Sequence, residues 1–489
     1  MKKVNAAPNA AALIEGMRDF GYSLETALAD VIDNSITANA KNVEIHADLF
    51  CDEPAIAIQD DGIGMTTEEL LAAMVPGSRN PRDIRDARDL GRFGLGLKTA
   101  SYSQCRRLTV LTRKDGKLSA ARWDLDAVAQ SNEWDLEIPK PSDVRFADRL
   151  KSDGTIVIWE KLDRVLGDGE AKSSLDDAKD SLANALDHLS LVFHRFIHGE
   201  RQLGKVRIAA NGVDLDPLDP FRADHPATIA SPVEKIGEGD REVKIQAFTL
   251  PHHSKVSTAE WNRYGGPEGW VKNQGFYVYR SGRLIIYGTW FRLARQQPLT
   301  QLSRVKIDLP NSLDADWKID VKKSYAKPPP AVRERLRTLI DTIGRTATRV
   351  YTHKGAKLND DNSLPIWARR QKDGKTSFVI NREHPVIESA ISGPEGEVAA
   401  QAVSLIEGAL PLDALLAALG GDPESVSEAN ISEEDLRGAL STMVANLVEA
   451  GSSEAEIRRV LAVAPPFSSQ PELTEQLLAD VSFVPRSDA

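Results

Sequence analysis

Asp30 and Asn34 stand four residues apart in the stretch Asp30-Val31-Ile32-Asp33-Asn34. On a helix, residues with this separation share one face, so the carboxylate and the amide would point the same way. An amide oxygen can ligate Mg²⁺, and a carboxylate beside it can orient and deprotonate an attacking water. The same spacing is common on amphipathic helices with solvated Asp and Asn, so this pair alone identifies no site.

A second group, Asp60-Asp61-Gly62-Ile63-Gly64-Met65, directly follows a strand-like run. An Asp at the end of a strand can accept a hydrogen bond from the exocyclic amine of a base. Two glycines would let the backbone pass close to a flat ring. The alternative interpretation is an ordinary Asp-Gly turn.

The third group is Gly91-Arg92-Phe93-Gly94-Leu95-Gly96-Leu97-Lys98-Thr99. Glycines that lead into the first turn of a helix present free backbone amides to phosphate, and Lys98 adds a positive charge. A dinucleotide-binding motif would need a strand before it, and here a charged loop precedes it. The sequence also lacks the GxxxxGK[ST] motif of P-loop ATPases.

In order and spacing, the three groups resemble the ATP-binding fold of the GHKL superfamily (gyrase, heat-shock chaperone, histidine kinase, MutL). In that fold a helix carries E-x-x-x-N, and D-x-G-x-G and G-x-x-G-x-G follow, the last beyond a lid. Gly154-Thr155 matches the family's Gly-Thr pair beside the adenine. The resemblance covers about residues 12–165 and implies an α+β fold, a Bergerat α/β sandwich that binds ATP and Mg²⁺.

The resemblance also implies a role for each matching residue. Asn34 would ligate Mg²⁺, Asp60 would bind the adenine amine, and Thr155 would support Asp60 through water. Gly62 and Gly64, with Met65 after them, would shape the base pocket. The phosphates would be held under a lid of residues 76–95 by Gly91, Gly94, Gly96, Lys98 and Thr99.

The sequence departs from the family at one position. The hydrolases of the superfamily place Glu where this chain has Asp30. Asp is shorter by one methylene, so it can act as the base only if the water or the helix lies closer. We therefore expect Asp30 to be the catalytic base of a slow ATPase, and the alternative is a scaffold that senses ATP without hydrolysing it.

The surrounding sequence predicts the elements that position these residues. Residues 11–41 read as two helices, and VEIHADLF, AIAIQDD, RRLTVLTR and GTIVIWEKL read as strands. The sequence predicts five parts: an ATP-binding domain (1–170), a bridging helix (171–202), a strand-rich domain (203–355), a basic strand module (356–393) and an acidic helical region (394–489).

The region 203–355 resembles the transducer domain that follows the pocket in gyrase B, MutL and MORC proteins. In those families a lysine from this domain reaches the γ-phosphate, and Lys323 or its neighbour Lys322 lies in the matching loop. A fixed cation there would stabilise charge on the phosphoryl oxygens. Two solvated lysines at the end of a strand are the alternative.

Charge and composition limit which partners the chain could have. The net charge is −11, but residues 394–489 hold seventeen Asp and Glu against four Arg, a balance of −13 that leaves about +2 for the rest. The body of the chain would therefore not repel DNA, and the acidic region could dock a partner protein. Two cysteines and the absence of a signal peptide or long apolar run predict a cytoplasmic protein that does not enter membranes.

Candidate DNA contacts include arginines in the lid, although these arginines alternate with aspartates and read more simply as a self-paired, solvated lid. The other candidates are the basic stretch WARRQKDGKTSF and the group Tyr277, Tyr279, Arg280 and Arg283, which also reads as a core strand. His188, His194 and His198 read as surface or core histidines rather than phospho-acceptors. The closest resemblance is to MORC-like ATPases, which implies an ATP-driven switch that forms a homodimer and acts on DNA or a protein, with phage defence as one setting. A chaperone-like ATPase is the other alternative.

Overall fold

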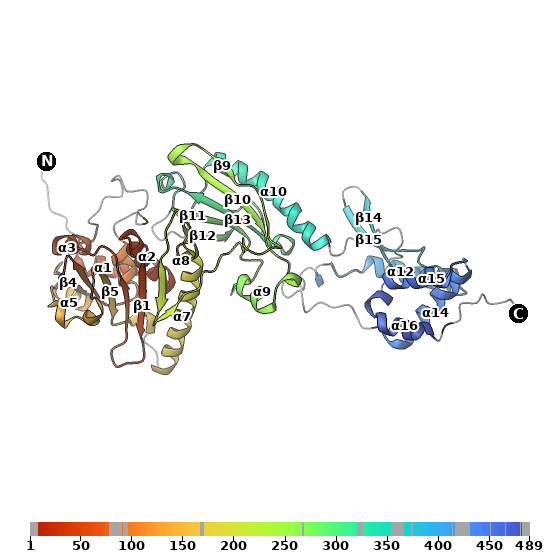
Figure 1. Cartoon of the computed structure of the whole chain (residues 1–489), viewed down its shortest axis with the longest axis horizontal. Coiled ribbons are helices and arrows are strands. Elements are labelled where there is room, and N and C mark those ends of the chain that lie inside the picture. The colour runs from red at the N-terminus through yellow and green to blue at the C-terminus, as the bar shows by residue number, and fades with distance from the viewer. Residues whose placement is uncertain are drawn as a thin grey trace. The chain divides into compact units, whose positions relative to one another are not determined.

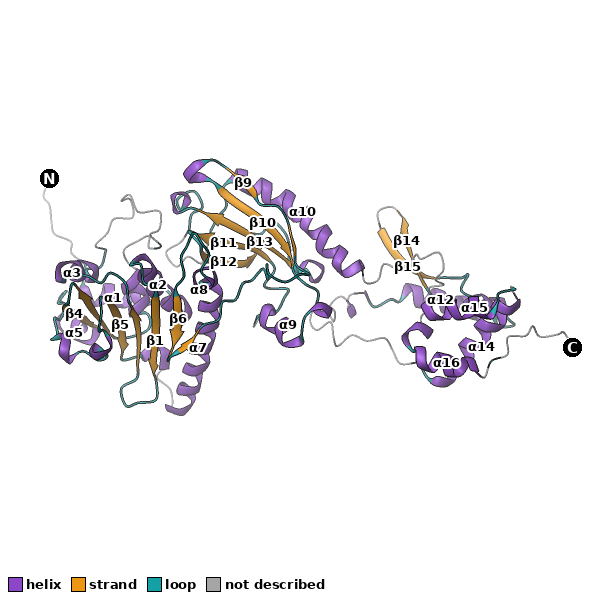
Figure 2. Cartoon of the chain, viewed as in Figure 1, coloured by secondary structure: helices purple, strands orange, loops and turns teal. Residues whose placement is uncertain are grey.

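The computed structural model describes residues 8–77, 90, 96–166, 171–266, 268–319, 326–353, 366–372, 375–412, 414–415, 431–449, 451–464, 466–479 and 481. The chain divides into two compact units. The first comprises Met1–Gln296 and Leu302–Gly344, and the second comprises Gln297–Gln301 and Arg345–Ala489. Helices and sheets occur in both units (Figure 2), which confirms the predicted α+β class.

The first unit begins with a seven-stranded sheet in the order β4-β3-β5-β2-β1-β6-β7 (Figure 1). Its strands are β1 (Asn42–Asp48), β2 (Ala55–Asp60), β3 (Arg107–Lys114), β4 (Lys117–Asp124), β5 (Gly154–Glu160), β6 (Arg207–Ala210) and β7 (Val213–Asp214). The accompanying helices are α1 (Ala10–Arg18), α2 (Leu24–Thr37), α3 (Thr67–Met74), α4 (Gly96–Tyr102), α5 (Leu125–Ser131), α6 (Asp163–Leu166), α7 (Ala171–Val192) and α8 (His194–His198).

Residues along the strands alternate between the two faces of this sheet, as the period of a strand requires. Val110 and Val157 pack into the large core that also contains side chains of α1, α2, α4 and α7. Their neighbours Leu111 and Ile156 belong to a smaller cluster with Val144, on the opposite face. The helices therefore cover one face, and the segment around two short 3-10 helices, Pro141–Asp143 and Ala147–Arg149, covers the other.

Helix α2 forms where the apolar spacing predicts it. Leu28, Val31 and Ile32 are fully or almost fully buried against the sheet. At its start, the Ser23 amide donates to the Thr26 hydroxyl, which satisfies a backbone group that the first turn leaves unpaired. Helix α7 packs against α2, so the central helix of the predicted site is enclosed on two sides.

The predicted boundary between residues 202 and 203 does not coincide with the edge of the first sheet. Strand β6 pairs in parallel with β1, and β7 pairs with β6, so the first sheet continues to Asp214. The helix predicted as a bridge packs on α2 and also contacts β12 (Arg283–Thr289). Main-chain pairing with a strand more than 150 positions earlier is a long-range contact that local patterning does not reveal.

The second sheet of this unit has the order β12-β11-β13-β10-β8, and β9 also pairs with β10. Its other strands are β8 (Ile229–Ala230), β9 (Glu234–Ile236), β10 (Val243–Thr249), β11 (Gly275–Arg280) and β13 (Ser303–Leu309). Helix α9 (Thr258–Gly265) lies between β10 and β11 in the sequence, and α10 (Pro330–His353) follows the sheet. Helix α10 lies along this sheet (Figure 2). Val332, Leu336, Leu339 and Ile343 recur at helical spacing and pack α10 onto the sheet.

The second unit contains a two-stranded hairpin and a group of helices. They are β14 (Trp367–Lys372), β15 (Lys375–Ile380), α11 (Pro385–Ser392), α12 (Gly396–Gly408), α14 (Glu433–Glu449), α15 (Glu454–Val463) and α16 (Pro471–Ala479). A core of its own, including Leu440, Met443 and Phe467, holds α14, α15 and α16 together. In the described part of the chain, every helix is too short or too polar to cross a membrane.

Candidate functional site

Asp60 ends strand β2 and is the centre of the site. Its side chain is 7% exposed, and it accepts hydrogen bonds from the Ser35 hydroxyl at 2.8 Å and from the Gly62 amide at 2.9 Å. Burial raises the pKa of the Asp60 carboxyl, and hydrogen bonds from Gly62, Ser35 and Thr155 only partly oppose that rise. Such a carboxylate is costly to bury and is typical of a functional position.

Ser35 is a site residue that the motifs alone did not reveal. It follows Asn34 on α2, and its side chain links the helix directly to the carboxylate at the end of β2. The adjacent Asp61 behaves differently, because it accepts hydrogen bonds from the amides of Lys41 and Asn42 and fastens the loop to β1. The two neighbouring aspartates therefore have separate roles, which the residue types alone could not distinguish.

The glycines of the second motif allow the backbone segments to approach each other. Gly64 has φ +60°, and a β-carbon added to it would lie 1.9 Å from the Arg113 carbonyl oxygen of β3. Gly154, at the start of β5, has φ +150°, and its added β-carbon would lie 2.1 Å from the Asp60 carbonyl oxygen. Close packing of the backbone therefore explains why glycine occupies both positions, in addition to the base contact expected of Gly64.

Gly64→Ala is therefore expected to destabilise the first unit by roughly 3 kcal/mol or more, since it combines a left-handed backbone with a direct clash. Gly116 is the matched control, because it has φ +78° in the β3–β4 turn and nothing within 4 Å of its added β-carbon. Gly116→Ala should cost only about 1–2 kcal/mol from the backbone. Denaturant unfolding of the full chain measures both, and equal losses would contradict the packing argument.

Thr155 lies opposite Asp60 in the β2–β5 pairing. Its hydroxyl is 3.2 Å from that of Thr112, which in turn accepts a hydrogen bond from the Met65 amide at 2.9 Å. These contacts connect the Asp-Gly motif, β3 and the Gly-Thr pair in one buried polar group. Thr155 is thus paired with Asp60 across the two strands, whereas the roles of Met65 and Thr155 in the base pocket remain predictions.

Asp30 and Asn34 lie on α2 as expected, in different surroundings. Asp30 is 6% exposed and accepts a hydrogen bond from the Tyr22 hydroxyl at 2.9 Å, whereas Asn34 is exposed. A β-carbon built on Gly96 would lie 3.5 Å from Oδ2 of Asp30. The first motif therefore meets the end of the third motif, although 66 positions separate them.

Gly96 begins helix α4, but the side chains after it turn inward. Lys98 is 2% exposed and donates to the Ala73 carbonyl oxygen near the end of α3 at 2.7 Å. Thr99 is fully buried, and its hydroxyl lies 3.4 Å from the Gly96 carbonyl oxygen. Their predicted phosphate contacts remain predictions, and Gly91 and Gly94 lie outside the described residues.

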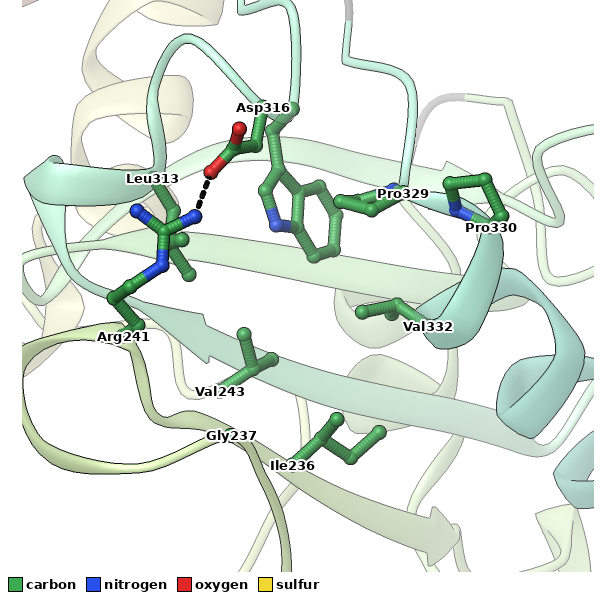
Figure 3. A pocket seen from close by; sticks show the side chains of 10 residues that line it. Ile236, Gly237, Arg241, Val243, Leu313, Asp316, Pro329, Pro330 and Val332 are labelled. Atoms are coloured by element: carbon green, nitrogen blue, oxygen red, sulfur yellow. Dashed lines mark hydrogen bonds and ion pairs between the residues drawn. The ribbon is translucent and has the colours of Figure 1, made fainter.

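Lys322 and Lys323 also lie outside the described residues, as do the lid arginines. The structure does describe the segment that leads to the lysines, as far as Ile319. Asp316 in this segment pairs with Arg241 beside a pocket of ≈ 430 Å³ (Figure 3). The pocket lies between β9, β10 and the start of α10, and it contains none of the motif residues, so we assign it no part in nucleotide binding.

Burial decides between the alternatives for two groups of residues. Tyr277, Tyr279, Arg280 and Arg283 are all at most 6% exposed, so this group is a core strand pair rather than a DNA-binding surface. His194 is buried and 2.8 Å from the Tyr279 hydroxyl, and burial lowers its pKa to about 3. A neutral, enclosed imidazole with a tyrosine partner is a core histidine.

In the stretch WARRQKDGKTSF, residues 367–372 form β14 and residues 375–378 form the first part of β15, with Arg370 paired opposite Ser377. Arg370 and Phe378 are exposed, so the hairpin presents a cation and an aromatic ring to solvent. This pattern is compatible with a nucleic-acid surface. The DNA contact remains a prediction.

Comparison with known proteins gives one family match and several similar proteins. Residues 22–155 match the family described as "Histidine kinase-, DNA gyrase B-, and HSP90-like ATPase". The protein "ATPase morc-1" of Caenorhabditis elegans is 33% identical over 95 residues, which are 19% of this chain and 11% of that protein. "Chaperone protein HtpG" of Mycolicibacterium vanbaalenii is 30% identical over 95 residues, 17% of this chain and 14% of that protein.

A second "Chaperone protein HtpG", from Mycolicibacterium gilvum, is 28% identical over 95 residues. The chain therefore spans only 11% to 14% of the length of these relatives. The matched family region contains Asp30, Asn34, Asp60 and Thr155, so the family match and the geometry concern the same residues.

Proposed function

This chain belongs to the GHKL ATPase superfamily and is related to the MORC proteins, and we propose that it is an ATP-driven conformational switch. One observation carries the proposal: three motifs distant in sequence meet around α2. Asp30 faces Gly96, and Ser35 on the same helix binds the buried carboxylate of Asp60 at 2.8 Å. The buried carboxylate of Asp60 and the glycine-rich start of α4 are both brought to α2, and this arrangement fits recognition of a base and its phosphates.

In the proposed complex, Asp60 accepts a hydrogen bond from the adenine amine, while Gly62, Gly64 and Met65 shape the base pocket. Thr155 supports Asp60 from the neighbouring strand. A site built to hydrogen-bond one polar group discriminates strongly against ligands that lack it, because its own buried group is then left unpaired. We therefore expect a preference for adenine nucleotides over guanine nucleotides.

The phosphates would lie toward the start of α4, held by Gly91, Gly94, Gly96, Lys98 and Thr99, with Lys322 or Lys323 at the γ-phosphate. Lys98 would first have to exchange its bond with the Ala73 carbonyl oxygen. Mg²⁺ fits the exposed amide oxygen of Asn34, since Mg²⁺ takes few protein ligands and shares the phosphates. When bound, the ion neutralises charge on the phosphoryl oxygens.

In the proposed reaction, Asp30 accepts a proton from a water whose oxygen attacks the γ-phosphorus. The bond between that phosphorus and the bridging oxygen breaks, which releases ADP and phosphate. Tyr22 donates to Oδ2 of Asp30 and fixes the orientation of the carboxylate. Because Asp is shorter than Glu, the reaction is expected to be slow.

We propose that ATP binding closes a homodimer through the N-terminal domain and that hydrolysis reopens it, with the second sheet relaying the change. With a non-hydrolysable ATP analogue and Mg²⁺, sedimentation velocity should show a dimer, whereas ADP should give the distribution of the nucleotide-free chain. Asp60→Asn is the matched control and should remain unchanged by the analogue. An identical mass in all nucleotide states would contradict the switch.

DNA is our first candidate partner, supported by the exposed cation and aromatic ring of the β14–β15 hairpin. A protein partner, docked through the acidic region, is supported by the similarity to two HtpG chaperones. Turnover stimulated by duplex DNA, and lost as salt rises, would favour the first. Turnover stimulated by an unfolded protein but not by DNA would favour the second.

A further inference from the structure

Two buried arginines flank the turn between β11 and β12. Arg280 and Arg283 are paired directly across the two strands, and they are 3% and 6% exposed. Ser281 and Gly282 between them have φ of +47° and +86°, as a tight hairpin turn requires. The side chains of both arginines extend beyond the second sheet and contact residues of the predicted ATP-binding domain.

Arg283 contacts the helix that carries the proposed catalytic and metal-binding residues. Its Nε donates to Oδ1 of Asp33 at 3.3 Å, and Asp33 is 1% exposed. Asp33 immediately precedes Asn34 on α2 and faces the interior, while Asn34 is exposed. The guanidinium group also lies 5.4 Å from the centre of the Phe193 ring. Any shift of α2 away from β12 must therefore disturb this buried pair.

Arg280 contacts two further segments. Its guanidinium group forms a fork with Asp314, at 2.7 and 2.8 Å, and donates to the Leu90 carbonyl oxygen at 3.0 Å. Leu90 directly precedes the third motif, and Asp314 begins the segment that leads to the proposed lysines. One side chain thus binds the main chain beside the phosphate motif and the base of the lysine segment.

Helix α2 completes the connection. The Leu90 amide donates to the Thr37 hydroxyl at 3.3 Å, and that hydroxyl donates to the Asp33 carbonyl oxygen at 2.8 Å. Asp33, Thr37, Leu90 and the two arginines therefore form a continuous polar network. Removing one member of a buried charged pair is unfavourable, because the other charge remains without its partner.

We propose that Arg280 and Arg283 are positioning residues that hold α2 and Leu90 in the arrangement required by the triphosphate and Mg²⁺. The inference rests on the proposed function. The arginines touch no nucleotide; they act through Asp33 and Leu90, and they couple the second sheet to the phosphate side of the site. Recognition of the base, which depends on Asp60 at the end of β2, lies outside this network and should not depend on them.

The test compares two probes, ATP with Mg²⁺ and adenosine, on the full chain. Arg283→Gln and Arg280→Gln should each weaken ATP·Mg²⁺ binding roughly tenfold, a usual size for coupling between sites, and leave adenosine binding within about twofold. Arg304→Gln is the matched control: Arg304 is 2% exposed and donates to the carbonyl oxygens of Pro220 and Tyr264, away from α2. It should change neither affinity by more than about twofold.

Equal losses for both probes, or the same pattern in Arg304→Gln, would overturn the inference and indicate a general loss of structure. Unchanged ATP·Mg²⁺ binding in both variants would overturn it as well. If Arg283→Gln does not fold, Arg283→Lys keeps the charge and provides the comparison. If the wild-type chain binds neither adenosine nor ATP, the proposed function itself is refuted. Failure of this inference and failure of the proposed function therefore give different results.

Discussion

Asp60→Asn is expected to abolish measurable ATP binding while leaving the fold intact. Asn has the same shape, so its oxygen can accept from the Gly62 amide and its nitrogen can donate to the Ser35 hydroxyl, at positions now 2.9 and 2.8 Å from the carboxylate oxygens. The substitution turns an acceptor into a donor where the adenine amine would bind. A loss of about 10⁴-fold or more in affinity follows when a buried polar group faces the wrong partner.

The pH dependence of stability gives this variant a second signature. Burial raises the pKa of Asp60 above its usual 3.8, so the folded chain holds this proton more tightly than the unfolded chain. The resulting stability is complete below 3.8 and is lost as the pH rises through the raised pKa. Asp60→Asn has no such loss, so its melting temperature should rise relative to wild type over that window.

Thermal unfolding of both proteins between about pH 4 and pH 8 measures this difference. Ser35→Ala is a useful companion, because it removes one donor to Asp60 without changing the charge. A variant that is less stable than wild type by the same amount at every pH would show that Asp60 is a structural residue. Retained ATP binding would remove it from the base pocket.

Asp30→Asn should lower single-turnover hydrolysis by about 10²–10⁴-fold, the usual contribution of a general base. Asn can still accept the hydrogen bond from Tyr22 but cannot take a proton from water. ATP affinity should change little, because the proposed role of Asp30 begins only in the reaction. Single-turnover release of phosphate, with binding measured separately, tests both statements.

Asp30→Glu separates the enzyme from the non-hydrolysing scaffold. Glu restores the family's residue, but the added methylene must fit a carboxylate that is 6% exposed and close to Gly96. Tyr22→Phe, which removes only the orienting hydroxyl, should lower the rate less than Asp30→Asn. Equal, background-level phosphate release by wild type, Asp30→Asn and Asp30→Glu would refute hydrolysis and favour the scaffold.

Much of the first domain could be predicted from local sequence. The apolar residues Leu28, Val31 and Ile32 predict α2 by their spacing, and the alternation in VEIHADLF predicts β1. The positions of Asp30, Asp60 and Gly96 at the ends and faces of these elements follow from the same patterns. The roles proposed for these residues rest instead on the resemblance of the ordered motifs to the GHKL superfamily, and no single motif would carry them.

The remaining features depend on contacts between distant positions. The residues next to Ser35 in the sequence do not indicate that it binds Asp60, and those next to Tyr22 do not indicate that it binds Asp30. These partners are set by how α2 packs against the sheet. The close approach of Gly64 to Arg113 requires β2, β5 and β3 to be in register. The pairing of β6 with β1 is likewise a contact between distant positions, because the pattern of KVRIAANG predicts a strand but not the sheet that the strand joins.

The central claim is tested most directly by titrating the full chain with ATP and Mg²⁺ in a calorimeter, beside the Asp60→Asn variant. We predict saturable binding at one site per chain in the wild type and none in the variant. No saturable binding of ATP by the folded wild type, or equal binding by both proteins, would contradict the assignment of this pocket.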